Sequence, residues 1–307
     1  MSVSRRAALK GLGAFGLAAA LPTAARASTP EASGADHHTV SAHSFAVGDA
    51  TVTVIRDTGF QIPPSAIGTN AADGAVETLL DSYGLPTDVV PTDVCVTLIE
   101  TGGERTLLDA GTGNGELMGT LSAIGIEPGS IDRVVISHFH GDHIGGIAPG
   151  GTPAFPNATV HMSAPEAAFL DGAGDDNRGA NAAKTAIDAV GFVQLYEDGA
   201  ELASGLTAVA APGHTPGHMA FLLQSGDARL MVGSDTANHP VAFFRHPEWG
   251  FGFDMDVPQT VATRYRVLGR AADERIPFLS THMPFPGVGR VSRDGAGFRF
   301  TPTPYAP

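Results

Sequence analysis

Residues 133–146 of the chain read RVVISHFHGDHIGG. The apolar, mostly β-branched run at its start predicts the end of a buried strand. Three histidines and one aspartate follow within six residues, at His138, His140, Asp142 and His143. The two glycines that close the stretch allow the backbone to turn tightly. We therefore expect the four polar side chains on a loop that leaves a strand end, where functional groups concentrate.

The spacing of these side chains indicates a metal site. His138 and His140 are two residues apart, so an extended backbone points both in the same direction. Asp142 and His143 are adjacent and must diverge, which a second metal ion would explain. Neutral imidazole and carboxylate are suitable ligands for zinc and similar divalent ions. A solvated histidine-rich turn is the alternative.

Three further polar residues each follow an apolar strand. His214 comes after the run 206–211, Asp235 after 229–232, and His282 after 277–280. Strand ends at one edge of a sheet share one face, so these side chains can converge with those of residues 138–143.

The order and spacing of these seven residues resemble the metallo-β-lactamase superfamily over essentially the whole mature chain. The resemblance implies an αββα sandwich, an α/β fold with two mixed sheets flanked by helices and a site at one sheet edge. It also implies two divalent ions per chain, expected to be Zn²⁺. The first ion would take His138, His140 and His214, the second would take Asp142, His143 and His282, and Asp235 would bridge both.

The implied chemistry is hydrolysis by a hydroxide that bridges the two ions, because such ions lower the pKa of bound water toward about 7. Asp235 would act as the bridging carboxylate. Asp142 could steer the hydroxide and pass a proton to the leaving group. The expected substrate is a small neutral molecule: an ester, a lactone or an organophosphate triester.

Details within the pattern favour some branches of the superfamily. Asp235 stands where true β-lactamases usually have Cys or Ser, and His140 where flavin-linked di-iron proteins usually have Glu. The overall layout is most similar to the methyl parathion hydrolase-like group, with acyl-homoserine lactonases as the sister possibility. Those lactonases commonly carry Tyr three residues after the bridging acid, where this chain has Asn238. A glyoxalase II-like thioesterase, a mononuclear iron sulfur dioxygenase and a non-catalytic zinc-binding protein stay open as alternatives.

Several residues outside the ligand set are candidates for the site. Asp109 resembles the acid that many superfamily members keep beneath the metals to orient an imidazole. His218, four residues after His214, is expected to be structural. The expected substrate-binding residues are Phe169, Asn238, His239, Phe243 and Phe244. For Phe243 and Phe244, packing in the core or at a dimer interface is the alternative, and for His239 the alternative is a plain surface position.

Composition describes a globular protein: 307 residues, 43% hydrophobic and 16% charged. The one cysteine, Cys95, excludes an internal disulfide and lies in an apolar run, where a small buried side chain is expected.

The N-terminus predicts export. Residues 4–10 read SRRAALK, which resembles the twin-arginine motif, and a short apolar stretch and a small-x-small cleavage site follow. We expect residues 1–27 to be a signal peptide, 28–44 a flexible lead-in, and 45–307 the hydrolase domain, located in the periplasm or secreted.

Loss of that signal peptide would also change the charge of the protein. Residues 1–27 hold four basic residues and no acid, so their removal changes the net charge from −14 to −18. A body this acidic repels phosphate backbones and anionic lipid surfaces. We therefore expect no nucleic-acid partner and no stable membrane insertion after cleavage, and we leave a homodimer open.

Hydrophobic patterns place the secondary structure. Strands are predicted at 51–55, 94–100, 106–109, 206–211, 219–224, 229–232, 277–280, 289–292 and 297–300. Helices are predicted at 116–124, from a capping box that begins at Ser163, at 180–190 and at 257–272. Residues 60–92 are interrupted by Pro and Gly and predict a long irregular connection.

Overall fold

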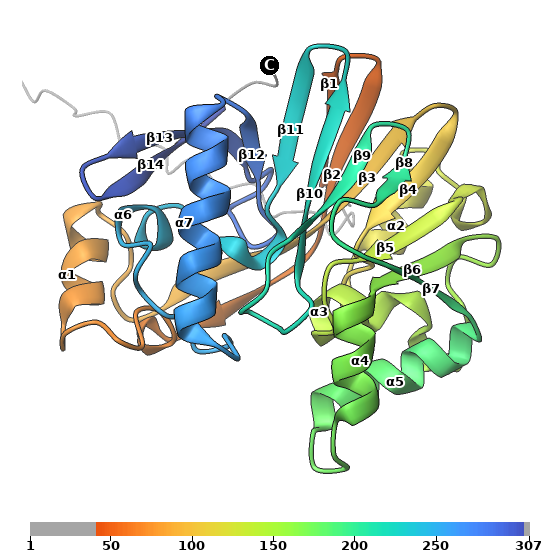
Figure 1. Cartoon of the computed structure of the whole chain (residues 1–307), viewed down its shortest axis with the longest axis horizontal. Coiled ribbons are helices and arrows are strands. Elements are labelled where there is room, and N and C mark those ends of the chain that lie inside the picture. The colour runs from red at the N-terminus through yellow and green to blue at the C-terminus, as the bar shows by residue number, and fades with distance from the viewer. Residues whose placement is uncertain (1–40, 304–307) are drawn as a thin grey trace, which may run out of the picture. The chain divides into compact units, whose positions relative to one another are not determined.

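The computed structural model describes residues 41–303, and its strands form two seven-stranded sheets (Figure 1). The first sheet follows chain order: β1 (Ala42–Val47), β2 (Ala50–Ile62), β3 (Val90–Thr101), β4 (Glu104–Leu108), β5 (Arg133–Ile136), β6 (Thr159–Ser163) and β7 (Val193–Tyr196). The second runs in spatial order from β14 to β8: β8 (Glu201–Ala203), β9 (Leu206–Ala210), β10 (Met219–Ser225), β11 (Ala228–Val232), β12 (Pro277–Leu279), β13 (Val288–Asp294) and β14 (Gly297–Pro302). Each sheet mixes antiparallel and parallel neighbours.

Helices lie on the outer faces of the two sheets. In Figure 1, α7 stands on one side of the sheets, and α4 and α5 stand on the other. The α-helices are α1 (Ala75–Ser82), α2 (Leu117–Ala123), α3 (Gly141–Ile144), α4 (Ala164–Gly172), α5 (Arg178–Val190), α6 (Ala242–Arg245) and α7 (Val257–Asp273). No helix in residues 41–303 has both the length and the apolar character needed to cross a bilayer.

Three apolar layers hold the four-layered sandwich together. Between the sheets, Val54 and Ile99 of the first pack with Phe221 of the second. Outside the first sheet, residues of α2, α4 and α5 cover β3 to β6, and outside the second, α1, α6 and α7 cover β11 to β13. Each fully buried Leu, Ile or Phe side chain contributes about 1.5–3 kcal/mol by leaving water. The predicted αββα architecture is confirmed.

The strand directions bring the candidate ligands together. β11 and β12 are parallel neighbours, so Asp235 and His282, just beyond their ends, lie at the same edge. β4 and β5 are also parallel, which places Asp109 beside the start of the 137–143 stretch. The amide of Asp109 donates to the carbonyl oxygen of Val135 at 2.9 Å.

Some expectations about secondary structure need correction. The predicted irregular connection 60–92 contains α1 and the start of β3, because the apolar side chains of Val76 and Leu80 pack in the core despite the surrounding Gly and Pro. β1 begins at Ala42, inside the expected lead-in, and pairs with β2. The short strands β7 and β8 were also not expected. Residues 1–27, predicted to be the signal peptide, lie outside the described part of the chain.

The burial of Cys95 gives a prediction about reactivity. The residue is 2% exposed on β3, and burial, with a smaller effect from the Asp93 carboxylate, raises the pKa of its thiol far above the ordinary value. Because the thiolate is the reactive form, the native protein should not react with Ellman's reagent at pH 8, whereas the denatured protein should release one equivalent. Asp227→Cys, in an exposed turn, is the positive control. Prompt native reaction of Cys95 would contradict the assigned core position.

Candidate metal centre

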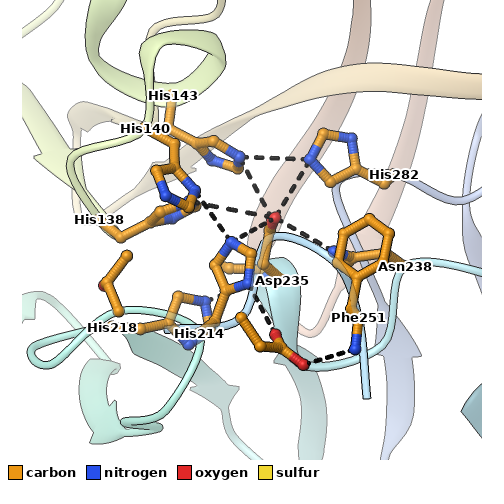
Figure 2. Close-up of polar contacts among 12 residues, drawn as sticks. His138, His140, His143, His214, His218, Asp235, Asn238, Phe251 and His282 are labelled. Atoms are coloured by element: carbon orange, nitrogen blue, oxygen red, sulfur yellow. Dashed lines mark hydrogen bonds and ion pairs between the residues drawn. The ribbon is translucent and has the colours of Figure 1, made fainter. Parts of the chain in front are cut away.

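The structure brings the seven predicted ligands together at one edge of the sandwich. Figure 2 labels all of them except Asp142. His138, His140, Asp142 and His143 lie on the segment from the end of β5 through α3, and the other three follow β9, β11 and β12. Their ligand atoms form three overlapping groups: His138, His140 and His214; His138, His143 and Asp235; and Asp142, His143 and His282.

Asp235 lies at the centre of this arrangement and is 3% exposed. Its Oδ2 is 3.2 Å from Nε2 of His214 and 3.2 Å from Nε2 of His282, and its Oδ1 is 3.3 Å from Nε2 of His143. One carboxylate thus contacts imidazoles assigned to both halves of the site, which is the geometry expected of a bridging ligand.

Three of the imidazoles are oriented by acceptors on their outer nitrogens. Nδ1 of His143 lies 2.8 Å from Oδ2 of Asp109, and Nδ1 of His214 lies 3.0 Å from Oδ1 of Asp254. Nδ1 of His282 lies 2.8 Å from the backbone carbonyl oxygen of Asp93. These oxygens only accept, so each Nδ1 must carry a proton. In a neutral ring Nε2 then carries the lone pair, as a metal ligand requires.

The ring nitrogens that face the centre of the site lie so close together that a cation between them is expected. His143 Nε2 is 3.3 Å from His282 Nε2, and His140 Nδ1 is 3.0 Å from His214 Nε2. Lone pairs repel at these distances unless a positive charge lies between them. Oδ1 of Asp235 is buried without a hydrogen-bond partner in the described structure, and such a burial is costly unless an ion satisfies it. The donor set therefore fits two divalent ions.

Burial and neighbouring charges shift the pKa values of these rings in opposite directions. Burial lowers the pKa of His140 to about 3. Burial would also lower the pKa of His214, but hydrogen bonding and attraction to Asp235 and Asp254 outweigh it and raise the pKa to about 9.

Asp109 organises the floor of the site, as the sequence predicted. Its Oδ1 accepts from the Ser137 amide at 2.7 Å, and its Oδ2 accepts from the Ser137 hydroxyl at 2.9 Å as well as from His143. Because that hydroxyl donates to Asp109, its oxygen is free to accept from Nδ1 of His138, 3.0 Å away. One buried carboxylate therefore orients two candidate ligands.

His218 is structural, in agreement with expectation. Its Nδ1 donates to the Ala211 carbonyl oxygen at 2.8 Å, which leaves Nε2 to accept from the Asp235 amide at 3.1 Å. Ser234, which precedes Asp235, has φ 44°, a backbone conformation that is uncommon for residues with a Cβ. The Ser280 hydroxyl supports this corner by donating to the Ser234 carbonyl oxygen at 2.8 Å.

Glu166 joins two ligand loops, a role that its sequence pattern did not indicate. The predicted capping box is half formed, since Ser163 accepts from the Glu166 amide at 3.2 Å. The Glu166 carboxylate is fully buried and instead accepts from the amides of Phe139, at 2.8 Å, and Gly217, at 2.7 Å. A Cβ at Gly217 would lie 2.1 Å from the Glu166 amide nitrogen, so this approach requires glycine.

Arg264 and Asp254 are also residues that sequence analysis missed. Arg264, on α7, is 1% exposed, donates to the carbonyl oxygens of Thr236, Pro247 and Trp249, and lies 3.9 Å from the Asp254 carboxylate. It thereby fixes the loop that presents Asp254 to His214. The only signal in the sequence was an arginine amid the apolar positions of a helix, which resembles an ordinary surface residue.

A cavity of about 370 Å³ opens over the ligands. Besides His140, Asp142, His214, Asp235 and His282, it is lined by Phe60, Thr92, Gly141, Phe251 and Phe253. Asn238 and His239 line a smaller neighbouring cavity that also reaches His282.

Three of the aromatic residues expected at the pocket lie elsewhere. Phe243 and Phe244 are 1% and 0% exposed and pack in the core beneath α7, because α6 turns them away from the ligands. Phe169 packs against Phe139, with ring centres 5.3 Å apart. The aromatic walls come instead from Phe60, at the end of β2, and from the loop before α7.

The anchoring of His214 gives a testable prediction. Asp254→Asn removes the charge behind the imidazole, and loss of such an outer partner typically costs about 10–100-fold in metal affinity. Zinc affinity, measured by competition with a chromophoric chelator, should fall at least about tenfold. Asp256→Ala is the matched control, because Asp256 caps α7 through the Gln259 amide and its loss should cost about 1 kcal/mol of stability while affinity stays the same. Equal affinities in both variants would contradict the role of Asp254.

Comparison with known proteins agrees with this geometry. A family model described as the metallo-beta-lactamase superfamily matches residues 89–267. The uncharacterized protein YobT of Bacillus subtilis is 29% identical over 169 residues, 51% of this chain and 68% of that protein. The N-acyl homoserine lactonase AttM of Azorhizobium caulinodans is 36% identical over 115 residues, which are 34% of this chain and 40% of the lactonase.

Solved structures share the fold at low sequence identity. AidC, a dizinc quorum-quenching lactonase, superposes with a TM-score of 0.82 at 24% identity and covers 87% of this chain and 98% of its own. AbOPH, a hydrolase in the beta lactamase superfamily, gives a TM-score of 0.80 at 24% identity, with 88% and 99% covered. The match of the family model, the αββα fold and the assembled ligand set show that this chain belongs to the metallo-β-lactamase superfamily.

Proposed function

We propose that the protein is a two-zinc hydrolase that opens neutral lactones. The observation that carries this proposal is the position of the ligand cluster at the base of an apolar cavity. Its volume, about 370 Å³, is that of a small-molecule site. Among the described residues that line it there is no Lys or Arg, so the protein offers no cationic side chain to an anionic group that lies away from the metal ions. A neutral substrate is therefore favoured.

The side chains at the cavity have distinct tasks in hydrolysis. Two divalent ions, when bound, supply an activated water and polarise the bond under attack. Asp142 lines the cavity, and its side chain is 26% exposed. Its Oδ2 lies 3.3 Å from Nε2 of His282. Its carboxylate can take a proton from the attacking water and deliver it to the leaving oxygen. Phe60 and Phe253, 39% and 52% exposed, provide apolar contacts at the cavity.

The relatives support a lactone as substrate. AttM, which matches over about a third of this chain, is an N-acyl homoserine lactonase, and AidC is a lactonase with two zinc ions. An aryl ester or organophosphate triester is a second candidate, because the exposed rings of Phe60 and Phe253 could stack on an aryl leaving group. The same activated water can attack a carbonyl or a phosphorus centre.

The remaining alternatives are less compatible with this cavity. A glyoxalase II-like thioesterase acts on a glutathione ester, whose carboxylates would require cations at the site. A non-catalytic zinc site is normally closed by protein ligands, whereas here the ligands line an open cavity. A mononuclear iron sulfur dioxygenase would leave part of the seven-residue set without a metal.

We further propose that the enzyme is exported by the twin-arginine route before it acts. The proposal is supported by the SRRAALK sequence at residues 4–10, which resembles the twin-arginine motif.

A substrate panel tests the hydrolase proposal. The zinc-loaded protein should give its highest kcat/KM with an acyl-homoserine lactone, lower values with an aryl ester and a phosphotriester, and the lowest with a β-lactam. Metal analysis should return about two zinc ions per chain. One iron per chain together with dioxygen uptake would contradict the proposal, as would a β-lactam that exceeds the lactone.

Export is tested with the paired arginines. Arg5→Lys with Arg6→Lys should leave the precursor in the cytoplasm, because these arginines define the motif. Fractionation of cells followed by immunoblotting measures the distribution. Normal periplasmic accumulation of the double variant would refute export by this route.

A further inference from the structure

Three hydrogen bonds join β3 to the loop that carries His282. The amide of Cys95 donates to the Thr281 carbonyl oxygen at 3.0 Å, and Nδ1 of His282 donates to the Asp93 carbonyl oxygen at 2.8 Å. The Asp93 side chain makes the third, because its Oδ2 accepts from the amide of Phe285 at 2.9 Å. Asp93 therefore contacts this loop twice, at the candidate ligand itself and three residues beyond it.

Arg56 of β2 holds the Asp93 carboxylate in the orientation that this contact requires. Its Nε donates to Oδ1 of Asp93 at 2.6 Å, so the two carboxylate oxygens have separate partners. The side chains of the pair are only partly shielded, at 38% exposed for Arg56 and 20% for Asp93. A charge-assisted hydrogen bond to one oxygen fixes the rotation of the carboxylate, and the other oxygen then faces the Phe285 amide.

The backbone of β2 makes room for this ion pair. A register shift between Arg56 and Thr58 places Gly59, instead of Thr58, opposite Asp93. A Cβ on Gly59 would collide with Nη2 of Arg56 and would lie 3.1 Å from Oδ1 of Asp93. Gly59 is not among the glycines with positive φ, so glycine is required here for space and not for backbone conformation.

His282 is anchored differently from the other two oriented imidazoles. His143 and His214 each meet a carboxylate at Nδ1, whereas His282 meets a backbone carbonyl oxygen. The carboxylate nearest to the His282 loop acts one step away from the ring, on the Phe285 amide. The position of His282 therefore depends on how firmly Asp93 holds the loop.

We propose that Asp93, oriented by Arg56, is the positioning residue for the second of the two metal ions, to which His282 is assigned. The inference rests on the proposed two-zinc site. Without the Asp93 carboxylate, the Phe285 amide loses its acceptor and the loop that carries His282 can shift. The ligands assigned to the first ion follow β5 and β9, so its binding should not change.

Zinc binding by Asp93→Ala tests this inference. Competition with a chromophoric chelator should give two zinc dissociation constants for the wild type. In the variant, one constant should weaken about 10–100-fold, the usual cost of losing a partner behind a metal ligand, while the other stays within about twofold. Anomalous diffraction from crystals of the variant with one equivalent of zinc should place the tightly held ion beside His138, His140 and His214.

Gly59→Ala tests the same contact without changing Asp93. The added methyl group displaces the Arg56 guanidinium, so the same constant should weaken about threefold, a smaller loss because partly exposed ion pairs contribute little. Two control variants should keep both constants. Asp273→Ala breaks an ion pair with Arg293 that lies between α7 and β13, and Gly172→Ala adds a Cβ that meets no atom within 4 Å.

The outcomes separate this inference from the function on which it rests. Two zinc ions in the wild type, with both constants unchanged in Asp93→Ala and Gly59→Ala, would overturn the inference and leave the two-zinc site in place. A wild type that binds a single zinc ion would contradict the proposed function and the inference together. Equal losses in both constants would show a general structural role for Asp93 and would also overturn the inference. If Asp93→Ala does not fold, the result with Gly59→Ala decides.

Discussion

The buried carboxylate of Asp235 is the constraint on which the rest of the structure depends. Three imidazole nitrogens lie within 3.2–3.3 Å of its oxygens at a position that is only 3% exposed. Burial of a charge is costly unless it is paired and hydrogen-bonded. Two bound metal ions would offset the free-energy cost of burying the Asp235 carboxylate, because they would pair with the carboxylate and with the lone pairs of the facing imidazoles.

Rigid parts of the sandwich hold the ligands in this arrangement. The ligands follow strand ends, which the sheets fix, and the outer nitrogens of His143, His214 and His282 meet acceptors from three separate segments. Two buried charged residues hold the loops that carry the ligands and their hydrogen-bond partners in place. Glu166 joins the loop after β5 to the loop after β9, and Arg264 fixes the loop that carries Asp254. Such buried charges are weak evidence for stability; here they position the residues that orient the metal ligands.

The sequence predicted the fold, and it predicted which side chains gather at the sheet edge, because each of these side chains follows a recognisable strand end. The 138–143 stretch, His214, Asp235 and His282 each follow an apolar run, and their order identified the superfamily. Asp254 and Glu166 were missed because their function arises only when distant loops meet. Phe243 and Phe244 were misplaced because an apolar segment after a ligand looks the same whether it faces a cavity or the core. α1 was missed because Gly and Pro surround a single short amphipathic helix.

The central claim is that Asp235 bridges two metal ions held by the other six residues. The most direct measurement is anomalous diffraction at the zinc absorption edge from crystals of the zinc-loaded protein. The account predicts two peaks about 3.5–4 Å apart, one beside His138, His140 and His214 and the other beside Asp142, His143 and His282, with the Asp235 carboxylate between them. A single peak, or peaks away from Asp235, would contradict it.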